Sequence, residues 1–356
     1  SKPVIVKAPG LVAPDFTWET VTQMDFGFDA SFLNNRLTGT FDWYRRNTKD
    51  MLVAGATLPA TLGASVPKSN SADMKTIGWE LSLGWNDRLE NGFSYWVKGV
   101  LSDYQATITK YAGNDAGFYS QSDDDGKYYV GQKIGEIWGY HSNGLFQSDD
   151  EAATIDQSEL YAGKWGAGDV KYEDLDNDGK ITKGEETIYN PGDKSIIGNK
   201  TPRYQFGITV GFDYKNFDFE MFWQGTGKRD YMLSGAQFWG FTSQWDVPYT
   251  PALDYWTETN TDAYFPRPGW QNGGNRVTSD RYLQSAAYGR LKNLTVGYTI
   301  PKNLTTKWGI SRLRLYVTGE NLLTITPLND AFDPETLGGM TYPINRKVAI
   351  GLNLTL

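Results

Sequence analysis

A run of carboxylates in the middle of the chain has the spacing of a calcium-binding loop. The ligands that this spacing predicts are Asp174, Asp176, Asp178, Lys180 (through its backbone carbonyl) and Glu185. Gly179 stands at the sixth loop position, where the chain must turn sharply. Converging carboxylates repel one another unless a cation lies between them, so we expect a structural Ca²⁺ here. The alternative is an Asp-rich solvated turn, because the flanking residues do not resemble EF-hand helices, and the spacing does not distinguish Ca²⁺ from Mg²⁺.

A second stretch, about residues 233–287, concentrates aromatic side chains. They are Phe238, Trp239, Phe241, Trp245, Tyr249, Tyr255, Trp256, Tyr264, Phe265 and Trp270. Aromatic faces stack on sugar rings or pack against apolar peptide, and they gather at recognition surfaces. Two alternatives stay open for any one of them: packing of a large loop on its neighbours, or contact with a partner protein. The stretch therefore predicts a binding surface without naming its ligand.

Other kinds of site have little support in this composition. The chain has no cysteine and one histidine, His141, which nearly rules out thiolate or His-ligated zinc and Ser-His-Asp catalysis. The formal net charge of −8 argues against nucleic acid as a partner. No segment has the charged start and apolar core of a signal peptide.

Alternating strands must position these candidate sites. In the segment 290–301, Leu294, Val296, Tyr298 and Ile300 alternate with small or polar residues. The last strand, 347–356, repeats the pattern with Val348, Ile350, Leu352 and Leu354. Successive side chains of a strand point to opposite faces, so each strand has one apolar and one polar face. We expect the apolar face to contact lipid and the polar face to line a wet lumen.

Composition agrees with a membrane-spanning barrel. The chain of 356 residues contains no run of 18 apolar residues, which excludes a transmembrane helix but not a barrel. Aromatic residues make up 15% of the chain, as expected for a barrel with two interfacial girdles.

The order of the predicted strands points to the same architecture. We predict nine, at residues 20–33, 36–53, 75–85, 93–111, 204–214, 217–224, 290–301, 313–320 and 347–356. Tight turns alternate with long connections, among them a Gly- and Ser-rich stretch at 55–72 and insertions at about 113–200 and 233–287. This alternation is typical of an outer-membrane barrel with short periplasmic turns and long extracellular loops.

An odd number of strands does not close a bacterial single-chain barrel. An open sheet would expose unpaired backbone groups to lipid, which the bilayer does not tolerate. We therefore expect residues 1–356 to be the C-terminal part of one transmembrane β-barrel domain, completed by an N-terminal polypeptide.

The motifs resemble those of SusC-like TonB-dependent transporters of the Bacteroidetes outer membrane. The matching stretches are Ala13–Thr20, Arg36–Gly39, Asp42–Tyr44, Ile134–Gly135, Trp138–Tyr140, Gly144–Gln147, Gly168–Tyr172, Asp174–Gly179, Ile196–Asn199, Gln224–Gly225, Trp256–Thr257, Tyr288–Tyr298, Asn321–Leu322, Asp333–Glu335 and Tyr342–Pro343. They cover nearly the whole chain in the family's order.

The resemblance implies a barrel of about 22 strands, of which this chain supplies the last nine or so. It also implies import of glycans or oligopeptides, a SusD-like surface lipoprotein over the loops, energy delivered through TonB, and a dimer of transporter–lipoprotein pairs. Two departures stand out. The family's N-terminal plug and TonB-contacting segment are not in this sequence, and the chain ends in Leu356 where the family usually has an aromatic residue.

These inferences predict an all-β fold, a transmembrane antiparallel barrel. They also predict that the protein is not an enzyme. The alternative function is an outer-membrane barrel hydrolase with its site at the extracellular loops. Trp256 falls in a stretch that matches the family and is assigned to loop packing. Trp239 and Trp245 fall outside the matching motifs, so they are the predicted substrate-stacking residues, together with Phe238 and Phe241.

Overall fold

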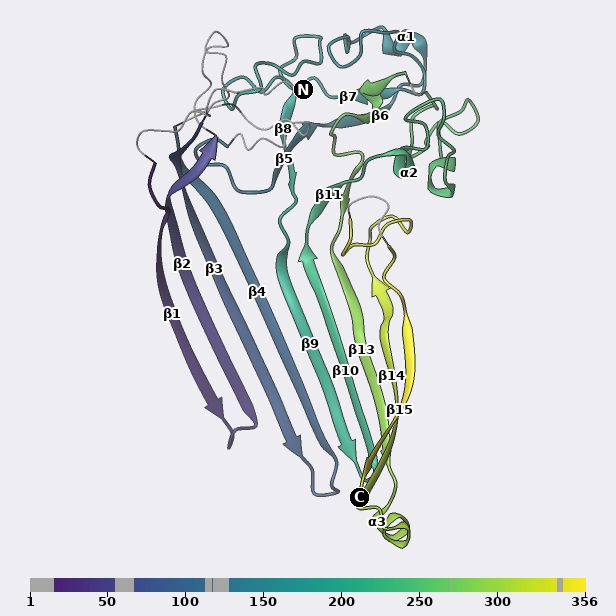
Figure 1. Ribbon diagram of the computed structural model, residues 1–356. Coiled ribbons are helices and arrows are strands. Elements are labelled where there is room, and N and C mark those ends of the chain that lie inside the picture. The colour runs from purple at the N-terminus through teal and green to yellow at the C-terminus, as the bar shows by residue number, and fades with distance from the viewer. Residues whose placement is uncertain (1–15, 55–66, 113–116, 118–127, 270, 338–341) are drawn as a thin grey trace, which may run out of the picture.

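One antiparallel sheet of nine strands dominates the computed structural model (Figure 1). The structure describes residues 16–54, 67–112, 117, 128–269, 271–337 and 342–356. The strands are β1 (Thr20–Phe32), β2 (Leu37–Ala54), β3 (Lys68–Arg88), β4 (Ser94–Tyr111), β9 (Arg203–Tyr214), β10 (Phe217–Lys228), β13 (Tyr288–Thr299), β14 (Arg312–Ile325) and β15 (Lys347–Thr355). They pair in chain order as a meander, which confirms the predicted succession of strands.

The short connections lie at one end of the sheet, the turn end, and the long ones at the other, the loop end (Figure 1). The predicted turn at Asn34 and Asn35 is confirmed, and both residues adopt left-handed φ values of 55° and 65°. Asparagine tolerates this region better than most residues, which suits it to a tight turn. The C-terminus and a short helical connection, α3 (Lys302–Thr305) with η4 (Thr306–Trp308), also lie at the turn end.

The register of the sheet separates two kinds of side chain. Phe219 pairs with Val296, Val296 with Val317, and Val317 with Ile350, so one apolar row crosses four strands. Val296 is 45% and Ile350 is 84% exposed, as expected for a surface that none of the described residues covers.

The neighbouring row, on the opposite face, is polar or small. It consists of Glu220, Thr295, Thr318 and Ala349. The predicted alternation of an apolar and a polar face is therefore present across these strands.

Several strands depart from the sequence-based boundaries: β10 continues to Lys228 and β14 to Ile325, beyond the predicted ends at 224 and 320, and β3 and β13 differ in ways that their partner strands explain. β3 begins at Lys68, whereas we predicted a loop up to residue 72; Ser69 and Asn70 pair with the end of β2, so pairing overrides weak local propensity. In β13, the register shifts between Leu291 and Asn293. This bulge lets Leu291 and Leu294 face the same apolar side although they are three residues apart.

The long connections form a separate structured layer, the loop cap, at the loop end (Figure 1). Its elements are β5 (Glu136–Tyr140), β6 (Ser142–Leu145), α1 (Asp149–Ala152), β7 (Val170–Tyr172), β8 (Lys194–Asn199), β11 (Asp230–Met232), α2 (Ala236–Trp239), η2 (Thr250–Leu253), η3 (Gly273–Arg276) and β12 (Leu283–Ser285). β5 pairs with β8, β6 with β7, and β11 with β12. None of the helices in the described ranges is long and apolar enough to cross a bilayer.

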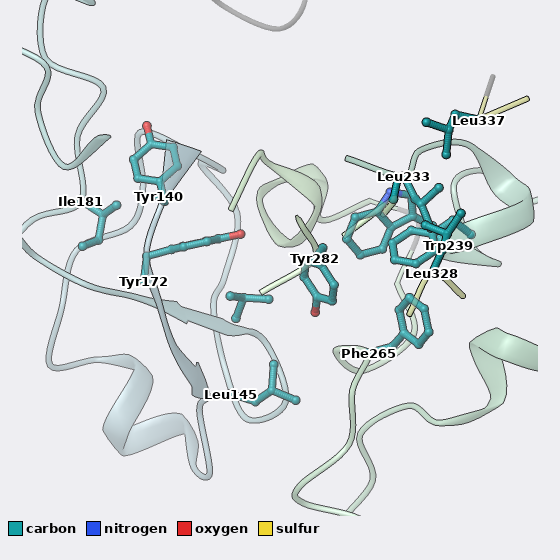
Figure 2. Packing of buried hydrophobic residues seen from close by; sticks show 13 residues of the cluster. Tyr140, Leu145, Tyr172, Ile181, Leu233, Trp239, Phe265, Tyr282, Leu328 and Leu337 are labelled. Atoms are coloured by element: carbon teal, nitrogen blue, oxygen red, sulfur yellow. The ribbon is translucent and has the colours of Figure 1, made fainter. Parts of the chain in front are cut away.

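The loop cap has a hydrophobic core of its own, to which the insertion at 113–200 contributes Tyr140, Leu145, Val170, Tyr172 and Ile181. Figure 2 shows Tyr140, Leu145, Tyr172 and Ile181 on one side of this core and the rings of Trp239 and Phe265 on the other, with Tyr282 between them. The core joins residues from both insertions, so its apolar members are too scattered in sequence to show a periodic pattern.

Candidate functional site

A buried carboxylate ties the two insertions together in the loop cap. Asp169 is 1% exposed and accepts hydrogen bonds from the Arg267 Nη2 at 2.9 Å and the Asn275 Nδ2 at 2.9 Å. It also accepts from the backbone amide of Gly166. Because a buried charge must be neutralised and hydrogen-bonded, this arrangement fixes Arg267 and Asn275 beside β7.

The predicted calcium loop forms a compact turn. Asp174 accepts backbone hydrogen bonds from Asn177 at 2.6 Å and from Gly179 at 2.8 Å. Asp178 accepts one from the amide of Lys180 at 2.8 Å. Gly179 has a φ of 84°, a left-handed value that favours glycine at this sharp turn.

The carboxylates that converge differ in part from those that the spacing predicts. Oxygens of Asp174, Asp176 and Asp193 lie within 4.8 Å of one another, whereas Glu185 is exposed and belongs to no such group among the described residues. Asp193 is fully buried, and its two oxygens accept from the amides of Leu175 and Thr182, each at 2.7 Å. It comes from an Asn-Pro-Gly-Asp turn outside the 12-residue spacing, and no local signal marks it as a ligand.

The electrostatics of this group favour a cation. Desolvation raises the pKa of Asp176 above its ordinary value, and the charges of Asp178, Asp193 and Asp174 raise it further. The neighbouring charges therefore oppose ionisation of Asp176, whereas at Asp174 desolvation is outweighed by hydrogen bonds from the backbone amides of Gly179, Asn177 and Asp178, which lower its pKa. A divalent ion would relieve the repulsion at Asp176.

The aromatic residues predicted to stack on substrate divide into two classes. Phe238 is fully buried and Trp239 is 8% exposed, so both belong to the loop core, and Trp239 also lines the hollow described below. Their burial fits the loop-packing alternative stated above, and substrate stacking by these two rings stays a prediction. Trp245 is 83% exposed, and Phe241 is half-buried beside a hollow. Trp270 lies outside the described residues.

The hollow is bordered by residues around α2 and η2, by residues 265–269 and by Asn275 and Arg276. It is lined by Trp239, Phe241, Ala252, Tyr255, Phe265, Pro266, Arg267, Pro268, Gly269, Asn275 and Arg276. Its volume of about 20 Å³ has room for a group little larger than one water molecule. Sequence reasoning found the rings of this region but missed the two arginines.

The lone histidine takes part in a polar array that sequence reasoning did not foresee. His141 Nδ1 lies 2.7 Å from Asp280 Oδ2, and its Nε2 lies 2.7 Å from Ser195 Oγ. A neutral imidazole can donate to the aspartate and accept from the serine hydroxyl. The order Ser-His-Asp matches that of acyl-transfer enzymes, although here it also links three separate segments of the loop cap.

Comparison with known proteins decides between a receptor and an enzyme. The sequence model of the TonB dependent receptor-like β-barrel matches residues 6–322. The chain belongs to this family. Its relatives are receptors rather than enzymes, which excludes the hydrolase alternative. We therefore assign the Ser195–His141–Asp280 array a structural role, in which it holds the loops together.

Individual relatives of this TonB-dependent receptor barrel lie in Bacteroidetes. The chain is 30% identical to TonB-dependent receptor P3 of Formosa agariphila, over 97% of this chain and 35% of that protein. It is 26% identical to the TonB-dependent receptor SusC of Bacteroides thetaiotaomicron, over 95% of this chain and 32% of that protein. The chain thus spans about a third of the length of these relatives.

The fold agrees with a solved transporter. The structure of the RagAB peptide transporter superposes with a TM-score of 0.73 and 22% identity, covering 96% of this chain and 36% of that one. The resemblance inferred from the motifs is confirmed, and the protein is a component of the outer membrane. In this family's orientation the loop cap faces the outside of the cell and the turn end faces the periplasm.

Proposed function

We propose that this chain forms the C-terminal part of the barrel of a SusC-like transporter that imports glycans or oligopeptides. The family match over residues 6–322, together with a nine-stranded sheet whose polar face can line a lumen, carries this proposal. The loop cap would form the outer rim of the pore, where an incoming oligomer is first bound.

The proposed transporter needs partners that this chain does not supply. The N-terminal part of the same transporter would add the plug and the remaining strands, and TonB would act through that part. A SusD-like lipoprotein would cover the loop cap, and two such pairs would form a dimer. The similarity to SusC supports the lipoprotein partner, and outer-membrane lipid would surround the apolar face.

Deletion of the full-length gene tests the proposed function. Because an importer acts on oligomers too large for general diffusion, the deletion strain should lose growth on a limiting glycan or peptide mixture. Growth on glucose and free amino acids should be unchanged. Undiminished uptake of every oligomer offered would contradict the proposal.

We also propose that the loop around Asp174 and Asp176 binds Ca²⁺ and orders the loop cap. Two ligand oxygens that are both about 2.4 Å from one ion are at most about 4.8 Å apart. The oxygens of Asp174, Asp176 and Asp193 meet this limit. The donor set consists of hard oxygens, which suits Ca²⁺ or Mg²⁺ rather than a thiophilic metal.

Elemental analysis of the purified full-length transporter tests the metal. Protein dialysed against calcium-containing buffer should retain about one ion per chain at this loop after free ions are removed. Absence of any bound divalent ion from protein equilibrated with both Ca²⁺ and Mg²⁺ would contradict it.

A further inference from the structure

Two cations lie at the loop end of the apolar face of β2 and β3 (Figure 1). On β3, every second residue contributes to this face, in the order Trp85, Leu83, Leu81, Trp79 and Ile77. Lys75 is the next residue of that series. On β2, Trp43 pairs with Trp79, and Arg45 is the next residue of its series. Because every second side chain of a strand points to the same face, Arg45 and Lys75 continue the apolar face toward the loop cap.

The register makes the two cations neighbours. Arg45 pairs with Ile77 and Asn47 with Lys75, so Arg45 and Lys75 lie diagonally opposite each other on adjacent strands. Such positions are about 7–8 Å apart, so both side chains can reach one anionic group. The two rows contain no carboxylate; across β1 to β4 they are Met24, Arg45, Ile77, Gln105 and Thr22, Asn47, Lys75, Thr107.

Neither cation forms an ion pair within the described part of the chain. The Nε of Arg45 donates to the Asn47 Oδ1 at 3.3 Å, which leaves the terminal nitrogens of its guanidinium for another partner. Asp103 lies one row closer to the middle of the sheet, and it is 7% exposed and paired with Arg203. The charge nearer the middle of the sheet is thus neutralised within the chain, whereas the two at the boundary are not.

The depth of Lys75 matches a membrane surface. Lys75 and Asp87 flank the apolar series of β3, and the strand covers about 40 Å between them at about 3.3 Å per residue. A strand tilted by about 40° therefore rises by about 30 Å, the thickness of the hydrocarbon core. The loop end faces the outside of the cell, so we place Lys75 and Arg45 at the surface of the outer leaflet.

The opposite face of the sheet is covered by the chain itself at this level. Met74 precedes Lys75 and therefore points the other way. It belongs to one apolar cluster with Ile108 of β4 and with Tyr128 and Ile134 of the first insertion. Lys75 and Arg45 thus face away from the side on which the insertion packs, toward the surroundings of the barrel.

We propose that Arg45 and Lys75 bind a phosphate group of a glycolipid in the outer leaflet. Guanidinium and ammonium groups form charge-assisted hydrogen bonds with phosphate. Trp43 and Trp79, in the next row toward the middle of the sheet, suit the boundary where headgroups meet acyl chains. The lipid would thereby supply the counter-charge that the chain does not. This inference rests on the outer-membrane location and does not depend on which oligomer is imported.

Lipid binding by the purified full-length transporter tests this inference. The detergent-solubilised, delipidated protein is titrated with bisphosphorylated lipid A, and native mass spectrometry measures the bound lipid. Lipid A without its phosphates and phosphatidylglycerol are the comparison lipids. We expect phosphorylated lipid A to bind at least about tenfold more tightly than either, and added salt should reduce this advantage.

Substitutions locate the binding site. Combining Arg45→Gln with Lys75→Gln should weaken lipid A binding at least about tenfold, whereas Arg45→Lys alone should retain most of it because the charge remains. Arg46→Gln is the matched control, because Arg46 is also exposed but lies on the opposite face, in the row of Gln23 and Thr76. Its affinity for lipid A should stay within about twofold of the unsubstituted protein. Heat-modifiable migration on gels checks that each variant is folded.

Three results would overturn the glycolipid site. One is equal affinity for lipid A with and without its phosphates. Another is an equal loss in the Arg45 and Lys75 double variant and in Arg46→Gln, which would assign the effect to overall charge. The third is equally tight binding of phosphatidylglycerol, which would mean that the two cations attract any anionic lipid. None of these results would bear on import, which the deletion strain tests separately.

Discussion

At the scale of single residues, the carboxylate loop offers two competing ligand sets. The spacing of the sequence assigns the last ligand to Glu185, whereas the folded chain brings Asp193 to Asp174 and Asp176. The amides of Leu175 and Thr182 hold the Asp193 carboxylate in a fixed position, which would reduce the entropy lost on binding an ion.

Substitutions distinguish the two sets. We expect Asp193→Asn to weaken Ca²⁺ binding by about 10-fold or more, since it removes a charge but keeps an oxygen in place. Glu185→Gln should leave the affinity within about twofold if Asp193 is the ligand. Calcium titration of both variants by calorimetry measures this difference, with circular dichroism as the control for folding. If Glu185→Gln weakened Ca²⁺ binding more than Asp193→Asn, the ligand set predicted from the sequence spacing would be correct.

The exposure of the tryptophans leads to a second prediction at this scale. Trp245→Ala should leave the loop cap folded, because that ring is 83% exposed, yet weaken substrate or lipoprotein binding by about 1–3 kcal/mol. Trp239→Ala should instead destabilise the loop cap by about 3–5 kcal/mol, because it leaves a cavity in the loop core. Ligand affinity, lipoprotein capture and amide exchange of the loops separate these effects. If the Trp245→Ala variant bound both ligand and lipoprotein normally, Trp245 would no longer be a candidate binding residue.

Part of the candidate site could be predicted from the sequence, and the rest could not, because it depends on contacts between segments that are apart in the chain. The Asp-x-Asp-x-Asp-Gly spacing is local, so it can be read directly. Asp193 and Arg276 enter their sites only when distant segments meet, and neither carries a local signal. Phe238 and Trp245 look alike in sequence, but folding buries one ring and exposes the other.

At the scale of elements, the alternation of β13 assigns two faces that mutation can distinguish. Val296→Arg should cost about 2–4 kcal/mol near the bilayer midplane, because it places a charge in lipid. Thr295→Arg should cost much less, since Thr295 lies on the opposite face, where its hydroxyl is hydrogen-bonded to that of Thr318 at 3.0 Å. Urea titration of the full-length barrel in lipid vesicles measures both. Equal costs would mean that the faces are misassigned.

A buried arginine joins β13 to the connection that follows β14. Arg290 is 2% exposed and forms ion pairs with Asp333 and with Glu335, the latter at 3.2 Å; Glu335 also pairs with Lys292. These residues belong to two motif stretches, Tyr288–Tyr298 and Asp333–Glu335, that are far apart in sequence but meet in the fold. Their role is therefore to hold this connection against the mouth of the barrel.

Removing that arginine should release the connection. We expect Arg290→Met to destabilise the docked segment 328–337 by about 3–5 kcal/mol, since it leaves two carboxylates without their buried partner. Faster amide exchange confined to that segment would be the signature. Arg312→Met, at the exposed turn end of β14, should leave exchange there unchanged. Equal protection in both variants would show that apolar packing of Leu328 and Leu337 suffices.

The strands were predictable because one physical requirement, an apolar face toward lipid, repeats every second residue. The early start of β3 and the bulge in β13 were not, because both depend on the neighbouring strand rather than on local sequence. The structured loop cap was the part of the fold that could least be predicted from the sequence. Its core joins residues from both insertions, so no single window of sequence displays it.

At the scale of the whole molecule, the sheet has two unpaired edges. β1 and β15 are its terminal strands, and neither pairs with the other in the described part of the chain. Their apolar side chains are largely exposed; Phe26 is 66% and Val348 is 70% exposed. Unpaired backbone groups are costly in lipid, so we expect both edges to pair with strands from another polypeptide segment.

This requirement gives the last prediction. Residues 1–356 expressed alone with an export signal should not form a stable barrel, because closing nine strands on themselves breaks the even-strand rule of bacterial barrels. The full-length transporter should run on gels as a compact form that unfolds on heating and should resist trypsin in its strands. Co-expression of the N-terminal part with this chain is the control, and it should restore both properties by pairing with β1 and β15. A heat-modifiable, trypsin-resistant species formed by residues 1–356 alone would refute the prediction, because it would mean that the two edges can close without further strands.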